Sequence, residues 1–100
     1  MPEAWFRVRW PDGAVETCYS PSSSIAHYFV AGTSYSLPEF LARSRAGLGA
    51  ASERVRERYG FPCSRAMGQL ARIEQAAAAI AEPDQATVTI ETMHIQGELP

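Results

Sequence analysis

A cysteine at the start of a predicted helix is the side chain best placed to do chemistry. Cys63 stands in the stretch GFPCSRA, directly before a run of helix-forming residues. A helix N-terminus favours a thiolate, and Arg65 would add a second positive charge nearby. A nucleophile also needs a general base, and only His27 or His94 could reach the thiol, through the fold. Cys63 is therefore a candidate catalytic nucleophile, or else a small apolar residue that fills space beneath Phe61.

The basic residues form a second candidate site. All 9 are arginines, and seven of them lie between positions 43 and 72. Arginine offers a planar, bidentate fork to carboxylates and phosphates. The simplest interpretation is a solvated helix face. The alternative is an anion-binding surface, whose candidates on this stretch are Arg54, Arg58 and Arg65.

The segment LARSRAGLGAASERVRERYG has some features of a helix-turn-helix unit, with Arg54, Arg56 and Arg58 on its second helix. Such arginines could contact phosphates or guanine edges. The alanine-to-glycine spacing of the usual turn is absent, however, and the net charge of −2 does not favour a nucleic-acid partner. A nucleic-acid-binding regulator is therefore kept only as a second alternative.

Residues with metal- or cofactor-binding chemistry are otherwise scattered. The two cysteines and two histidines show no CxxC or HxxxH spacing, and Gly47-x-Gly49 is too short for a phosphate loop. We therefore predict no metal and no cofactor. Beyond Cys63 no catalytic residue is indicated, so whether the protein is an enzyme stays open, and we favour a non-catalytic role.

Two alternating segments, 4–10 and 14–20, predict a β-hairpin around Pro11-Asp12-Gly13. A bulged turn at Gly13 would set Arg9 opposite Ala14, and Arg7 opposite Glu16. Five side chains would then share one face of the hairpin: Trp5, Arg7, Arg9, Glu16 and Cys18. The opposite face would carry Phe6, Val8, Val15, Thr17 and Tyr19.

The rest of the chain predicts three helices and one more strand. The helices are expected over 21–30, over 37–59 after the capping box that begins at Ser36, and over 64–81. Gly47 and Gly49 should kink or break the second helix. The β-branched run 86–95 predicts a third strand, beside the first.

These elements predict a single domain over residues 1–100, with an ordered core over 4–95 and a loose tail over 96–100. The fold class is a two-layer α+β domain: a three-stranded, mostly antiparallel sheet with helices on one face, in the order β-β-α-α-α-β. The sheet face without helices would expose an aromatic ring and a thiol among charges, which indicates a surface for a homodimer or another partner, or an ordinary hydrated face. With no signal peptide or apolar span in the sequence, we expect a cytoplasmic protein and no membrane contact.

Three segments resemble a known protein family: FRVRWPDGAVETCYSPSSSI, YSLPEFLARSRAGLGAASERVRERYGFPCS and QLARIE. The family is a group of small bacterial nitrogen-starvation-response proteins, and the resemblance runs from about residue 5 to about residue 80. Its most specific parts, CYSPS and YGF-x-CS, contain Cys18 and Cys63. The resemblance implies no catalytic residues.

What the resemblance implies is a genomic setting. Members are encoded beside a nitrilase, a radical S-adenosylmethionine protein, an acetyltransferase, an aminoimidazole-ribotide-synthase-like protein and a flavoprotein, in clusters linked to nitrile or cyanide assimilation. We therefore expect a non-catalytic accessory protein that binds a cluster-encoded enzyme or a second copy of itself. A small anionic metabolite is a further candidate partner, and a thiol-dependent enzyme or carrier using Cys63 is the first alternative function.

Overall fold

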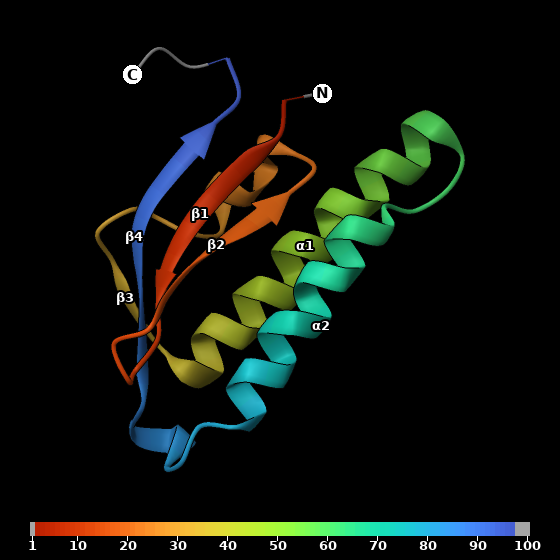
Figure 1. Ribbon diagram of the computed structural model, residues 1–100. Helices are drawn as coiled ribbons and strands as arrows, with labels where there is room; N and C mark the ends of the chain where they lie inside the picture. The colour runs from red at the N-terminus through yellow and green to blue at the C-terminus, as the bar shows by residue number, and fades with distance from the viewer. Residues whose placement is uncertain (1, 98–100) are drawn as a thin grey trace.

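The computed structural model describes residues 2–97 and shows a four-stranded antiparallel sheet with two long helices packed on one face (Figure 1). The strand order in the sheet is β2-β1-β4-β3. The elements are β1 (Ala4–Arg9), β2 (Val15–Ser20), the 3-10 helix η1 (Ser23–His27), β3 (Ser34–Ser36), α1 (Leu37–Tyr59), α2 (Ser64–Ala78), the 3-10 turn η2 (Pro83–Gln85) and β4 (Thr87–Ile95). The α+β class and the one-sided helical layer are confirmed, and β4 pairs beside β1 as expected.

The predicted element order was wrong in two places, so the observed order is β-β-β-α-α-β. The missed strand, β3, has only three residues, and Ser34 pairs opposite Thr89 of β4. Ser34-Tyr35-Ser36 alternates, but three residues are too few for a periodic signal, so the strand is recognised only through its pairing with β4. The segment over 21–30 forms the single short helix η1, which Ser22 caps by accepting a hydrogen bond from the Ser24 amide.

The hairpin register differs from the prediction by one residue. Trp10 donates to the Ala14 carbonyl at 2.8 Å, so the loop holds only Pro11-Asp12-Gly13, with Gly13 at φ 90°. Arg9 therefore pairs with Val15 rather than Ala14. Because side chains alternate along a strand, a one-residue shift moves every β2 side chain to the opposite face. Glu16 and Cys18 thus lie on the helix-covered face, and Val15, Thr17 and Tyr19 on the uncovered one.

Helix α1 is continuous, so the predicted break at Gly47 and Gly49 was wrong. The two glycines differ in their surroundings. A Cβ at Gly47 would lie 2.6 Å from Ile25 Cδ1 and 3.1 Å from the Tyr28 ring, whereas a Cβ at Gly49 would meet nothing within 4 Å. The absent side chain of Gly47 lets η1 approach α1 closely. That packing offsets the low helix propensity of glycine.

This difference predicts opposite effects for two matched substitutions. Gly49→Ala should raise the free energy of unfolding by about 0.5–1 kcal/mol, because it adds helix propensity without a clash. Gly47→Ala gains the same propensity but must displace Ile25 and Tyr28, and overpacking costs about 1–3 kcal/mol, so the variant should be less stable than wild type. Urea denaturation followed by circular dichroism measures both. Equal stabilisation by the two variants would contradict this packing.

Helix α2 begins after Cys63, as predicted, and ends three residues earlier than expected. The amides of Ala79 and Ile80 donate back to Ala76 and Ala77 in a final tight turn. Beyond β4, the Gln96 amide donates to the Glu3 carbonyl at 2.8 Å, which ties this part of the predicted tail to the start of β1. Residues 98–100 of that tail lie outside the described residues.

The core lies between the sheet and the helical layer. The inward side chains of β1 and β4 form one side of it: Phe6, Val8, Val88 and Ile90. The other side consists of Phe29, which follows η1, and of residues from the two helices: Phe40, Leu48 and Ile73. One face of the sheet is thereby covered by the helices, and the side chains on the other face are not.

Candidate functional site

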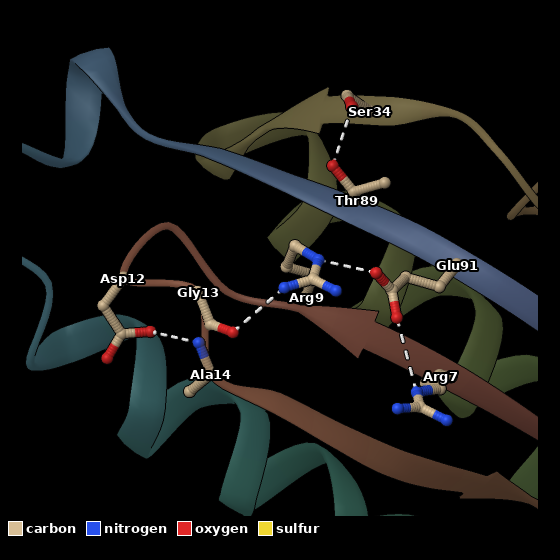
Figure 2. A network of polar contacts seen from close by, with 8 residues as sticks. All are labelled: Arg7, Arg9, Asp12, Gly13, Ala14, Ser34, Thr89 and Glu91. Carbon is tan, nitrogen blue, oxygen red and sulfur yellow. Dashed lines mark hydrogen bonds and ion pairs between the residues drawn. The ribbon is translucent and has the colours of Figure 1, made fainter.

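The uncovered side of the sheet carries a group of outward side chains, here called the open sheet face: Trp5, Arg7, Arg9, Thr17, Tyr19, Glu91, Thr92 and His94. The strand pairings set Trp5 beside both Tyr19 and His94, and Arg7 beside both Thr17 and Thr92. Figure 2 shows part of this face at its charged end.

Glu91 organises the charged end of the open sheet face. It is the extra residue of a β-bulge, because Ile90 pairs with Val8 and Thr92 pairs with Arg7. Its Oε1 forms an ion pair with Arg7 Nε at 3.3 Å, and its Oε2 accepts a hydrogen bond from Arg9 Nε at 2.5 Å (Figure 2). The pairing of Arg7 with Glu16 that the sequence suggested does not form. Two arginines against one carboxylate leave a net positive charge at this end.

The other end of the open sheet face is aromatic. The ring of Trp5 lies 6.1 Å from that of Tyr19, edge to face, and 6.0 Å from that of His94. The Arg65 guanidinium, from the start of α2, lies 3.8 Å from the centre of the Tyr19 ring and 3.8 Å from the Glu3 carboxylate. This cation–π contact brings a third arginine to the edge of the face.

Tyr19 is held neutral within this cluster. Its hydroxyl donates to the Glu3 carboxylate. Desolvation by burial, followed by this hydrogen bond and the negative charge of Glu3, raises the pKa of Tyr19 to about 12. Tyr19 therefore acts as a fixed hydrogen-bonded ring for contact, rather than as an acid or base near neutral pH.

Cys18, expected on the open sheet face, is instead fully buried beneath the helices. Burial, together with the charge of Glu16, raises the pKa of the Cys18 thiol to about 12, although Arg72 acts in the opposite direction. Glu16 accepts hydrogen bonds from the Trp10 indole at 2.6 Å and from Arg72 at 3.2 Å. Neither Cys18 nor Glu16 is available on the uncovered side of the sheet.

Cys63 is half-buried at the N-cap of α2, where its backbone amide donates to Ser52 Oγ at 3.2 Å. It borders a shallow cleft of about 270 Å³ together with Glu3, Tyr19 and Tyr59. Neither histidine lines this cleft. Among residues 2–97 the Cys63 thiol makes no hydrogen bond to a general base. The Glu3 carboxylate, the group of that type in the cleft, accepts instead from the Tyr19 hydroxyl.

The arginines of α1 lie on its exposed side and near its end. Arg56 forms an ion pair with Glu53, and the hydrogen bond lowers the pKa of the Glu53 carboxyl. Arg58 lies over the Tyr59 ring, 5.8 Å from its centre, and Arg54 is exposed. Because α1 has no turn at its centre, these arginines do not belong to a helix-turn-helix unit.

Over residues 2–97, no three His, Cys, Asp or Glu side chains gather closely enough to hold a metal ion. None of the helices described has the length and apolar character needed to cross a membrane.

The sequence predicted part of the open sheet face and missed the rest. Trp5, Arg7 and Arg9 were expected there and lie there. Tyr19, Glu91 and His94 were not. Tyr19 depended on the hairpin register and His94 on the bulge in β4. Glu91 directly follows the inward-facing Ile90, so alternation alone could have placed it on this face. A three-residue loop at Pro11-Asp12-Gly13 was the one sequence signal that could have corrected the register.

Comparison with known proteins gives one match. No curated protein and no solved structure matched the chain. The family model described as nitrogen starvation-induced protein NitG matches residues 5–93, which include both helices and nearly all of the sheet. The match spans the two cysteine motifs and the strand β4, beyond the segments whose resemblance was evident from the sequence. The chain therefore belongs to the nitrogen starvation-induced protein NitG family.

Proposed function

We propose that this protein is a non-catalytic accessory protein of the nitrogen-starvation response that binds a partner protein through the open sheet face. The partner we propose is an enzyme encoded in the same nitrilase-linked gene cluster. The observation that carries the proposal is the one-sided helical layer (Figure 1). It leaves an aromatic cluster and an arginine-rich cluster together on β1, β2 and β4.

The composition of the open sheet face suits a protein interface. Binding energy at interfaces is concentrated in Trp, Tyr and Arg side chains that are already held in place. Trp5 and Tyr19 pack against each other, and Arg7 and Arg9 are fixed by Glu91 while about half of each arginine side chain stays exposed. These side chains would lose little conformational freedom on binding.

Charge favours an acidic partner over a second copy of the chain. The open sheet face and its edge carry Arg7, Arg9 and Arg65 against only Glu3 and Glu91. Two copies joined face to face would bring two positive surfaces together, which is unfavourable at an interface. A partner whose surface combines a carboxylate with an apolar patch would complement both ends of the face.

The alternative functions have less support. The thiol-dependent enzyme or carrier would need a base beside Cys63. No histidine lines its cleft, and the Glu3 carboxylate there already accepts from Tyr19 and lies 3.8 Å from Arg65. The helix-turn-helix form of the nucleic-acid-binding regulator would need α1 to divide into two helices, and α1 is continuous.

Binding of purified cluster-encoded proteins tests the proposal. We expect one of them to bind the wild-type protein, and Trp5→Ala or Arg7→Glu to weaken that binding at least about tenfold, because each removes a central contact. Arg54→Glu is the matched control, since it reverses an exposed charge on α1, away from the sheet, and should leave binding unchanged.

Two results would contradict the proposal. One is failure of every cluster-encoded protein to bind. The other is a wild-type homodimer that Trp5→Ala or Arg7→Glu dissociates, which would assign the open sheet face to self-association instead. Thermal melting of each variant by circular dichroism separates loss of binding from loss of folding.

A further inference from the structure

A second concave site lies on the helical side of the sheet, apart from the open sheet face. It is a cleft of about 530 Å³ between the β1–β2 turn and the last turns of α2. Both elements lie at the same end of the molecule (Figure 1). Its lining combines apolar and charged residues, chiefly Trp10, Asp12, Glu16, Arg72, Ala76 and Ile80. The volume falls within the range of small-molecule sites, about 300–1,000 Å³.

The apolar wall of this cleft is fixed in place. The Trp10 ring packs edge to face on Phe40, with ring centres 5.5 Å apart, and its indole N–H donates to Glu16 at 2.6 Å. Ala76 of α2 and Ile80, in the tight turn just beyond that helix, both line the cleft. An apolar side chain of a ligand would therefore meet a preformed surface rather than one that must reorganise.

The charged wall places a carboxylate and a guanidinium side by side. Arg72 Nη2 donates to Glu16 Oε1 at 3.2 Å, and the Trp10 indole donates to the same oxygen. Within residues 2–97, Glu16 Oε2 accepts no hydrogen bond, and Arg72 makes no other. Asp12 adds a second carboxylate at the rim, with Oδ1 accepting from the Ala14 amide at 2.9 Å (Figure 2). Glu16 and Arg72 both line the cleft, and each thus keeps capacity for further hydrogen bonds there.

We propose that this cleft binds a free α-amino acid with an aliphatic or aromatic side chain. Such a molecule carries a carboxylate and an ammonium group on one carbon, which is the complement of adjacent Arg72 and Glu16. Its carboxylate would accept from the guanidinium of Arg72, and its ammonium group would donate to Glu16, with Asp12 nearby. Its side chain would lie against Trp10, Ala76 and Ile80.

Titration of nitrogen-15-labelled protein with L-leucine and L-phenylalanine tests this site. The chain has two tryptophans, so it gives two indole N–H resonances, which Trp5→Phe assigns. We expect the Trp10 resonance to shift saturably and the Trp5 resonance to stay in place. Leucinol lacks the carboxylate and 4-methylpentanoate lacks the ammonium group, so both should bind at least about tenfold more weakly than leucine.

The variants separate recognition of the ligand from general effects. Arg72→Ala and Glu16→Gln should each weaken leucine binding at least about tenfold, because each removes a charge-assisted hydrogen bond. Arg45→Ala is the matched control: Arg45 is an equally exposed arginine in the helical layer, paired with Glu74 at 3.0 Å, and it does not line the cleft. It should bind like wild type.

Three outcomes would overturn the proposal: no saturable shift of the Trp10 resonance up to about 10 mM amino acid, binding of leucinol as tight as that of leucine, or unchanged binding in Arg72→Ala and Glu16→Gln. The titration needs no partner protein. Its result is therefore independent of whether the open sheet face binds one.

Discussion

Phe29→Ala is expected to lower the free energy of unfolding by about 3–5 kcal/mol, a large part of the stability of a domain of this size. Phe29 is 1% exposed, and its ring centre lies 5.5 Å from that of Phe6, 5.3 Å from that of Phe40 and 5.5 Å from that of Tyr35. These rings belong to β1, α1 and β3. Truncation of Phe29 would leave a cavity where the sheet, the short β3 segment and the helical layer meet.

Phe61→Ala provides the matched control for this prediction. Phe61 is the same residue type but 65% exposed, in the turn between α1 and α2, so its truncation should change stability by no more than about 0.5 kcal/mol. Urea denaturation of both variants, followed by circular dichroism, gives the comparison. A Phe29→Ala variant as stable as Phe61→Ala would mean that the aromatic core is not packed as described.

The second large effect concerns alkaline pH. The Cys18 thiol has an ordinary pKa of 9.0, which burial raises to about 12 in the folded protein. Between these values the native state holds a proton that the unfolded state releases. The contribution of Cys18 to stability is thus fully present below pH 9 and is lost as the pH rises toward 12. The loss should amount to several kcal/mol, since each pKa unit corresponds to about 1.4 kcal/mol.

Comparison of variants isolates this effect from that of Tyr19, whose pKa is also raised to about 12 and which acts in the same direction. The free energy of unfolding, measured under reducing conditions from pH 8 to pH 11, should fall less steeply for Cys18→Ala than for wild type. Cys63→Ala retains the Cys18 thiol, so its stability should fall more steeply than that of Cys18→Ala. Parallel slopes for wild type and Cys18→Ala would show that the Cys18 thiol is not buried.

The elements that the sequence predicted well are those with local signals. The Ser36 capping box fixes the start of α1, with Ser36 Oγ accepting from the Glu39 amide at 3.3 Å. Helix α2 begins directly after Cys63, and the alternating run of β1 forms a strand that buries Phe6 and Val8. Each of these features depends on residues within a few positions of one another.

The features that were missed depend on long-range contacts. Gly47 remains in a continuous helix because Ile25 and Tyr28 pack against it, and those residues lie some twenty positions earlier in the chain. The strand β3 exists only through its pairing with β4, and Thr92 and His94 lie on the open sheet face because of a bulge in β4.

One residue of hairpin register had the largest consequence for the candidate site. The predicted turn placed Cys18 with Trp5 and Arg7, whereas the observed three-residue loop buries Cys18 and brings Tyr19 to the open sheet face. Side chains alternate along a strand with a period of two. A register shift of one residue, the smallest there can be, therefore exchanges the two faces of β2.

Site-specific photo-crosslinking in nitrogen-starved cells tests the central claim most directly. A photoreactive residue at Thr92 lies on the open sheet face, and one at Glu57 lies on the exposed side of α1. We expect the Thr92 position to give a crosslink whose partner, identified by mass spectrometry, is an enzyme encoded in the nitrilase-linked cluster, and the Glu57 position to give none. A cluster-encoded enzyme crosslinked from Glu57 but not from Thr92 would contradict the account.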